Sequence, residues 1–252
     1  MTVKFQVPAL ICMIIAVSLV GCETTTSEKS NYALTDGKSE SILDSRIKSL
    51  ENEAVKYPLR SDLHYNIASL YAKKGDCAES AKSLDRAIAI SPNESKYHFH
   101  LGRLFLAMQD LDRAEREFRS ARSLSREGRY TGPHAALAWT LSLKKQTEAA
   151  IEEFEKCVKI EPENPAYYYW LGASHDIQGR REKAIHNFRE YLARGGIAYR
   201  SKAVEILQSL GVAPADIPDS PRTSRSEDLF SASMDAESKP AEAKPEEAKP
   251  GN

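Results

Sequence analysis

The chain has 252 residues, with 35 lysines and arginines against 36 aspartates and glutamates. This length accommodates one large domain or two small ones. A formal net charge of −1 argues against a generally basic nucleic-acid-binding protein. Four cysteines are too few to hold a chain of this length together by disulfides. Composition excludes these classes, and the order of segments along the chain indicates more.

The first segment, residues 1–21, has the composition of an export signal. Lys4 supplies a short positive region, and the stretch 5–20 carries no charged residue. That stretch is too short and too poorly flanked for a stable membrane-spanning helix. The segment leads into Leu19-Val20-Gly21-Cys22, which resembles the lipobox of bacterial lipoproteins. The alternative interpretation is an uncleaved anchor, or an ordinary signal peptide with a chance cysteine.

The lipobox resemblance implies a covalent anchor at Cys22. In that family the signal peptide is removed before the cysteine, which then carries a diacylglycerol and an N-acyl lipid. Acyl chains bind a protein to a membrane with roughly 0.8 kcal/mol per buried CH₂. Glu23 stands where an aspartate favours retention in the inner membrane. The resemblance therefore implies a lipid-anchored protein of the cell envelope, attached to the outer membrane and facing the periplasm.

The middle of the chain contains an internal repeat. Apolar residues with successive spacings of 34, 36 and 34 occur at Ile67, Leu101, Leu137 and Leu171, and again at Leu84, Phe118, Phe154 and Phe188. Small residues keep the same spacing at Ala68, Gly102, Ala138 and Gly172. This period and residue set resemble the tetratricopeptide repeat, in which each unit is a pair of helices. The small residue lets the second helix approach, and the large apolar residue fills the space beneath.

The resemblance implies an all-α fold, an α-solenoid of helix-turn-helix units. We assign four repeats and a C-terminal capping helix to residues 61–94, 95–128, 131–164, 165–198 and 199–212. Residues 41–60 are expected to form an N-terminal capping helix or a degenerate half-repeat. Capping elements cover the apolar surface that the terminal repeats of an array would otherwise expose.

Both ends of the chain are expected to be flexible. Residues 22–40 have almost no apolar content and are interpreted as a tether from the lipidated cysteine. Residues 213–252, rich in proline, alanine, glutamate and lysine, bury too little apolar surface to offset chain entropy, which predicts disorder. Within this tail the one apolar pair, Leu229-Phe230, is either a docking motif or part of a solubilising segment.

The sequence shows no pattern for catalysis or for a metal site. It lacks a His-Glu-x-x-His run, a P-loop and a glycine-rich dinucleotide turn. His64, His98 and His134 occupy one position in successive repeats, but neighbouring helices are too far apart for these three to share a metal ion. This ladder of histidines therefore predicts packing between repeats. We expect no enzyme activity, no metal, and no cofactor besides the lipid at Cys22.

Two other groups of residues have a structural interpretation. Cys77 and Cys157 are expected to be small buried residues that form no bridge. Arginines recur every three or four residues at Arg113, Arg116, Arg119, Arg122, Arg126 and Arg129. This run is either a patch for an anionic partner or a solvated helix face with weak ion pairs, and the second is favoured.

The best candidate site is the concave face of the array. In the tetratricopeptide family the first helix of each unit lines the ligand groove. The matching positions here are Tyr65, Asn66, Ser69, Lys96, Phe99, His100, Arg103, Leu106, Trp139, Leu143, Tyr169, Trp170 and Asp176. Tyrosine, tryptophan and arginine, which dominate binding hot spots, are frequent in this set. The alternative is that several of these residues pack between helices, first among them Phe99 and Trp170.

We therefore predict a lipid-anchored periplasmic scaffold or assembly factor of a cell-envelope complex. It would bind a protein or peptide in the concave groove, and no nucleic acid. The alternative is a structural envelope lipoprotein associated with peptidoglycan or another glycan. The sequence leaves the partner and the oligomeric state open.

Overall fold

The computed structural model describes residues 37–125 and 130–218. The predictions for the signal segment, for Cys22 and for the Leu229-Phe230 pair concern residues outside these ranges. Within the described ranges all regular structure is helical. The elements are α2 (Gly37–Lys56), α3 (Ser61–Lys74), α4 (Cys77–Ile90), α5 (Ser95–Ala107), α6 (Leu111–Leu124), α7 (Gly132–Leu143), α8 (Thr147–Ile160), α9 (Pro165–Ile177), α10 (Arg181–Ala193), α11 (Arg200–Ser209) and a 3-10 helix, η2 (Pro214–Asp216).

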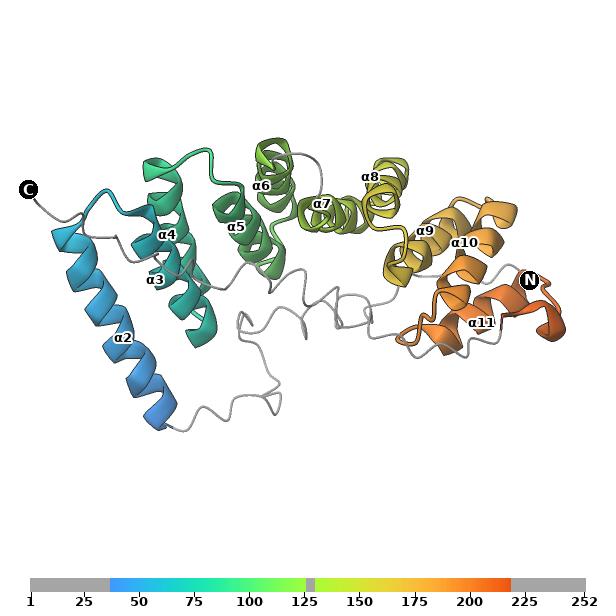
Figure 1. The fold of residues 1–252 in the computed structure, drawn as a ribbon, viewed down its shortest axis with the longest axis horizontal. Helices are drawn as coiled ribbons and strands as arrows, with labels where there is room; N and C mark the ends of the chain where they lie inside the picture. The colour runs from blue at the N-terminus through green and yellow to red at the C-terminus, as the bar shows by residue number, and fades with distance from the viewer. Residues whose placement is uncertain (1–36, 126–129, 219–252) are drawn as a thin grey trace, which may run out of the picture.

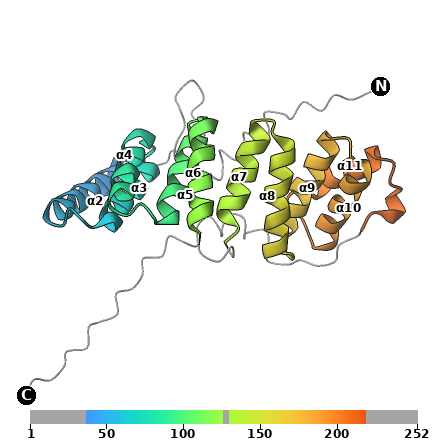
Figure 2. The ribbon, with the colours of Figure 1, turned by 90° about the horizontal axis from the view of Figure 1, so that it is seen from above.

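Helices α3 to α10 pair as four hairpins, one inside each of the four assigned repeats. Each hairpin packs against the next, so the array runs from α2 at one end to α11 at the other (Figures 1 and 2). The all-α solenoid expected from the sequence is confirmed. Among the described residues, the main contacts join helices that follow one another in the chain.

The first helices of the hairpins line the inner side of this array. Beyond the contacts between consecutive helices, α5 also touches α7, which is the first helix of the next hairpin. Figure 1 shows α6 and α8 on the outer side of the arc, with α5, α7 and α9 on the opposite side. We call the surface formed by α3, α5, α7 and α9 the inner face.

Aspartates start the second helix in two of the repeats. The Asp76 carboxylate accepts a hydrogen bond from the backbone N–H of Glu79 over 3.1 Å. The Asp110 carboxylate accepts one from the backbone N–H of Arg113 over 3.0 Å. Each bond satisfies an N–H group that has no partner within the first turn of a helix.

The turn inside each hairpin needs a left-handed backbone. The residue at this position has a φ of 85° at Gly75, 60° at Gln109, 61° at Lys145 and 67° at Gly179. Glycine adopts this conformation without steric cost, whereas a residue with a Cβ is crowded by its own backbone. The turns at Gly75 and Gly179 therefore have the residue that adopts this conformation freely. The turns at Gln109 and Lys145 are strained.

Close packing within each hairpin depends on the small residues of the first helix. A Cβ placed on Gly102 would lie 2.8 Å from the ring of Phe118, and one placed on Gly172 would lie 3.0 Å from the ring of Phe188. Both rings are fully buried. The small residue and the large ring fill one space together, as the sequence predicted.

The two ends of the array differ from the expected boundaries. Helix α2 begins at Gly37, inside the segment interpreted as a tether. At the other end, residues 213–218 belong to the array and not to a flexible tail. The reason is that Ile217 packs against the last core cluster, and the Arg200 side chain donates a hydrogen bond to the Pro218 carbonyl over 3.4 Å.

The two cysteines of the repeats differ from each other. Cys157 is a buried free thiol, as expected, and burial raises its pKa so that it stays protonated. Cys77 is half-buried and disulfide-bonded, so the expectation that it forms no bridge was wrong. Cys77 is the first residue of α4 and packs, partly buried, against the main core cluster. The partner cysteine lies outside the described residues.

Candidate functional site

Two groups of aromatic residues lie on the inner face. Together they contain six of the thirteen predicted site residues, and two more, Lys96 and Arg103, border them. The N-terminal aromatic cluster joins α3 and α5 to the segment just before α7 and consists of Tyr65, Tyr97, Phe99, His100 and Tyr130. The C-terminal aromatic cluster spans α7 and α9 and consists of Trp139, Tyr169, Trp170 and Tyr199. In both, the contacts cross from one repeat to the next.

The N-terminal aromatic cluster is centred on Tyr65. Its hydroxyl lies 3.0 Å from Nε2 of His100, and its ring centroid is 5.4 Å from that of Tyr97. The Lys96 ammonium lies over both tyrosine rings, 5.6 Å from the Tyr65 centroid and 5.4 Å from the Tyr97 centroid. A cation in this position is attracted to the negative faces of the rings.

A second cation borders the same cluster. The guanidinium carbon of Arg103 is 6.0 Å from the centroid of Phe99. Phe99 also meets His100 and Tyr130 edge to face, at centroid distances of 5.7 Å and 5.9 Å. The cluster thus combines rigid rings with two positive side chains, one on each side of a histidine.

His100 is neutral at physiological pH. Burial of its imidazole, together with the charges of Arg103 and Lys96, lowers the pKa of His100 to about 3. A neutral ring can share a hydrogen bond with the Tyr65 hydroxyl without adding a third charge. The positive charge of this part of the inner face therefore comes from the lysine and the arginine.

The C-terminal aromatic cluster is a continuous chain of ring contacts. The centroids of Trp139 and Trp170 are 4.0 Å apart, and Trp170 lies 4.8 Å from Tyr169 and 5.2 Å from Tyr199. Tyr169 and Tyr199 are stacked, with centroids 4.5 Å apart and planes 20° from parallel. Such pairs add about 0.5–1.5 kcal/mol to the effect of area burial alone.

The predicted site residues differ in how much surface they offer. Phe99, Trp139 and Tyr169 are 1%, 8% and 7% exposed, so these three pack between helices. Trp170 keeps part of its surface accessible, although the sequence pointed to it before Trp139 as a packing residue. The accessible part of the inner face comes from the exposed Asn66 and from half-buried residues: Tyr65, Ser69, Lys96, His100, Arg103, Leu106, Leu143, Trp170 and Asp176.

Ser69, Leu106, Leu143 and Asp176 stand outside the two aromatic clusters. Leu106 packs against the main hydrophobic core. Burial raises the pKa of the Asp176 carboxyl, since the charged form loses hydration there. These residues extend the inner face but add no further ring contact to it.

Sequence reasoning missed three aromatic residues of the inner face. Tyr97 falls between two positions that the family pattern assigns to the groove. Tyr130 belongs to the two-residue insertion between the second and third repeats, to which no role was given. Tyr199 lies between α10 and α11, where the period of 34 residues no longer applies. The aromatic side chain itself was the one available signal in each case.

The comparisons agree with this geometry. A family model described as tetratricopeptide repeat matches residues 47–95 and 65–130, and a second one with the same description matches residues 133–164. Residues 47–130 and 133–164 are therefore tetratricopeptide repeats. A comparison with curated proteins gave no match.

Solved tetratricopeptide structures share the fold at low sequence identity. MamA is 18% identical with a TM-score of 0.57, over 66% of this chain and 94% of the MamA chain. YrrB, described as a tetratricopeptide protein with an unusual peptide-binding site, is 14% identical with a TM-score of 0.58, over 68% and 86% of the two chains. PilW, described as a widely conserved type IV pilus biogenesis factor, is 16% identical with a TM-score of 0.56, over 71% and 82%.

Two histidines of the ladder also make contacts inside their own repeats. Nδ1 of His98 lies 2.8 Å from a carboxylate oxygen of Glu117, and Nδ1 of His134 lies 2.7 Å from one of Glu153. His98 and His134 therefore each pair with the second helix of their own tetratricopeptide unit. The geometry of the hairpin is the reason, because it places residues 19 apart in sequence opposite each other. Nε2 of His98 also lies 3.0 Å from the Pro92 carbonyl of the preceding repeat, so His98 makes the predicted contact between repeats as well. Among the described residues, no group of three or more potential ligands could hold a metal ion.

Three of the four arginines of the run that the structure describes form ion pairs within the array. Arg113 bonds to Asp110 over 2.6 Å, Arg119 pairs with Glu115, and Arg122 reaches Glu153 of the next repeat over 2.7 Å. Arg126 and Arg129 lie outside the described residues. The described part of the run thus supports the interpretation as a helix face with ion pairs.

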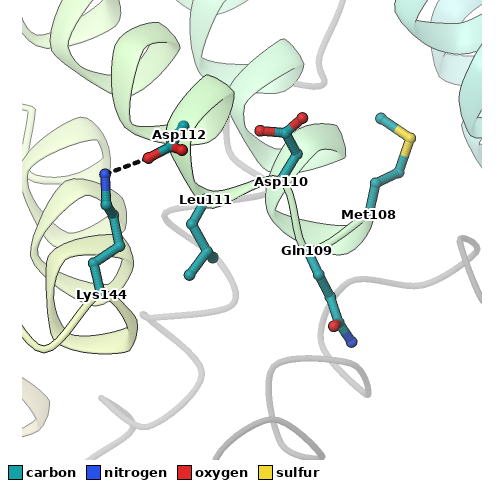
Figure 3. A pocket seen from close by; sticks show the side chains of 6 residues that line it. All are labelled: Met108, Gln109, Asp110, Leu111, Asp112 and Lys144. Atoms are coloured by element: carbon teal, nitrogen blue, oxygen red, sulfur yellow. Dashed lines mark hydrogen bonds and ion pairs between the residues drawn. The ribbon is translucent and has the colours of Figure 1, made fainter.

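A shallow depression lies away from the inner-face clusters, beside the turn between α5 and α6. Figure 3 shows its lining side chains and the ion pair between Lys144 and Asp112. The Lys144 ammonium lies 2.6 Å from Asp112 and 2.5 Å from Glu115. Lys144 follows α7, so these contacts join one repeat to the previous one and indicate a structural role.

None of the helices in the described ranges is both long and apolar enough to cross a bilayer.

Proposed function

We propose that this tetratricopeptide protein is a scaffold that binds a peptide segment of another protein on its inner face. The observation that carries the proposal is the pair of aromatic clusters on one face, bordered by Lys96 and Arg103. Rigid rings give contact area at low entropic cost, and arginine can bind carbonyl or carboxylate groups. No part of the proposal involves catalysis.

The face defines the chemistry of its ligand. Trp170 and Tyr199 offer half-buried rings, which suit an apolar or aromatic side chain. Lys96 and Arg103 suit a carboxylate one or two repeats away. An extended segment with an apolar residue followed by acidic residues meets both requirements. The YrrB likeness supports peptide binding on this fold, since that protein is described as having a peptide-binding site.

We further propose that the scaffold is lipid-anchored at Cys22, faces the periplasm from the outer membrane, and serves assembly of a cell-envelope complex. The lipobox-like sequence 19–22 supports the anchor. The likeness to PilW, a pilus biogenesis factor, supports a role in assembly.

Photo-crosslinking in the cell tests the inner face. A photoreactive residue at exposed Asn66 should capture one dominant protein, whereas the same residue at Glu152 on α8 should not. Trp170→Ala combined with Arg103→Ala should reduce capture at least tenfold, because both side chains are partly accessible. Trp170 also packs against both core clusters, so circular dichroism has to show that the double variant is still folded. Arg116→Ala with Glu152→Ala is the matched outer-face control. Capture of glycan alone would contradict the proposed binding of a protein segment. Capture that the inner-face variant leaves unchanged would contradict it too.

Metabolic labelling with a fatty acid tests the anchor. Cys22→Ser should abolish labelling and release the protein from the membrane fraction, and Cys12→Ser, in the same segment, should change neither. Equal labelling of both variants would contradict the proposed anchor. Separation of the two membranes on a density gradient then tests the outer-membrane location.

A further inference from the structure

The described chain ends beside the C-terminal aromatic cluster. After α11 the chain turns back, Ile217 packs against the last core cluster, and the carbonyl of Pro218 accepts a hydrogen bond from Arg200 over 3.4 Å. Arg200 directly follows Tyr199, whose ring stacks on Tyr169. The remaining 34 residues, 219–252, therefore start at the α11 end of the array, close to the C-terminal aromatic cluster.

The chemistry of the following residues matches that face. Leu229-Phe230 is an apolar pair in a polar segment, and the stretch 227–237 contains four acidic residues and no basic one. The C-terminal aromatic cluster offers rings to the apolar pair. Farther along the same face, Lys96 and Arg103 offer positive charge, while His100 between them is neutral. Two of the acids, Glu227 and Asp228, precede the apolar pair. The other two, Asp235 and Glu237, follow the pair along the tail as the cations follow the rings along the face.

The length of the connection allows the pairing. Leu229 lies eleven positions after Pro218, which gives a reach of about 36 Å when extended and an average span of roughly 18 Å as a flexible coil. Trp139 lies only two ring contacts from Tyr199, at 5.2 Å and 4.0 Å. The apolar pair can therefore reach the tryptophans without stretching the linker.

We propose that residues 227–237 of the chain dock on the inner face of the same molecule, with Leu229 and Phe230 on the C-terminal aromatic cluster and with Asp235 and Glu237 toward Arg103 and Lys96. The inference rests on the proposed use of this face for binding. A short linker holds a segment at an effective concentration on the order of millimolar, so even weak intrinsic binding gives substantial occupancy. A partner then competes with the tail, and its apparent affinity falls by the fraction of the face that is free.

The chain contains its own probe for this contact. Trp139 and Trp170 are its only tryptophans, and both belong to the C-terminal aromatic cluster. Collisional quenching of tryptophan fluorescence by acrylamide in the full chain therefore reports cover over this cluster. Leu229→Ala with Phe230→Ala should raise the quenching constant about twofold. Glu246→Ala with Glu247→Ala, a matched double variant beyond the docking segment, should leave it unchanged.

Charge and concentration separate the possible outcomes. Asp235→Ala with Glu237→Ala should raise quenching at low salt, and the difference should shrink at 1 M salt as the charges are screened. An effect of Leu229→Ala with Phe230→Ala that disappears on dilution would overturn the proposal, because it would mean docking onto a second copy. Identical quenching in all variants would also overturn it.

Partner capture distinguishes this failure from a failure of the proposed function. With a photoreactive residue at Asn66, the variant Leu229→Ala with Phe230→Ala should capture several-fold more partner than the unmodified tail. Equal capture from both tails, together with unchanged quenching, would refute tail docking and leave the binding role of the inner face standing. Loss of capture in the inner-face variant is a separate result, which bears only on that role.

Discussion

The ring of Phe118 on α6 occupies the space that a side chain on Gly102 of α5 would need. An added Cβ would lie 2.8 Å from two of its ring carbons, closer than real Cβ contacts come. The ring is fully buried, so it has no free volume to move into. This one contact sets how closely the two helices of the second repeat approach each other.

Gly102→Ala should therefore destabilise the array, although alanine favours helix. Overpacking of this kind costs about 1–3 kcal/mol, and the better helix propensity of alanine returns up to about 1 kcal/mol. Urea unfolding followed by circular dichroism measures the difference. Adding Phe118→Leu to Gly102→Ala should cost less than the sum of the single changes, and strict additivity would contradict the steric explanation.

Glu153 should make stability fall in acid. Burial works to raise the pKa of Glu153, but hydrogen bonds from His134 and Lys156 and the charge of Arg122 outweigh burial and lower the pKa to about 2. A carboxyl whose folded pKa is lowered stabilises the fold above its unfolded pKa, and this contribution is lost as pH falls toward 2. Urea unfolding of Glu153→Gln should show a weaker loss between pH 5 and pH 2.

At pH 7 the same variant should be less stable by roughly 1–3 kcal/mol, because it leaves partly buried cations without a counter-charge. Glu152→Gln, at the neighbouring exposed position, is the control and should match the parent protein at both pH values. A parallel acid dependence in the parent and in Glu153→Gln would show that other carboxylates dominate.

His98 should have the opposite pH dependence. Its hydrogen bond to Glu117 raises the pKa of His98 against the opposing effect of burial. A histidine whose folded pKa is raised adds stability below its unfolded pKa, about 6.5, and loses this contribution as pH rises through the folded value. Chemical shifts of the imidazole should give the raised pKa of His98 directly, and Glu117→Gln should lower that pKa.

Glycine should suit the two strained turns better than the native residues. Gln109 and Lys145 have φ values of 60° and 61°, where their neighbours in the pattern are glycines. Gln109→Gly and Lys145→Gly should each stabilise by about 0.5–1 kcal/mol, the relief of left-handed strain less the extra entropy of the unfolded chain. Ser142→Gly, inside α7, should instead destabilise by a similar amount. Destabilisation by all three changes would show that the turns carry little strain.

The repeats were predictable because the residues that make each hairpin pack recur at the same positions in every unit. The spacing from Gly102 to Phe118 recurs, and the same small and large residues must meet in each hairpin. The pairing of His98 with Glu117 was missed because it depends on how one helix is rotated against the other. The burial of Trp139 in place of Trp170 likewise depends on contacts with the next repeat. Tyr199 lay beyond the last unit, where no period constrained it.

The contacts between successive helices have a consequence for how the chain acquires its structure. Each hairpin meets its main partners within about two repeat lengths of sequence, so the separation between contacting residues is small for a chain of this size. Structure formation in such arrays can start at any unit and spread to its neighbours. A chain that is released gradually from its N-terminus can therefore fold its hairpins in order. Each hairpin packs against the previous one before the last helix is available.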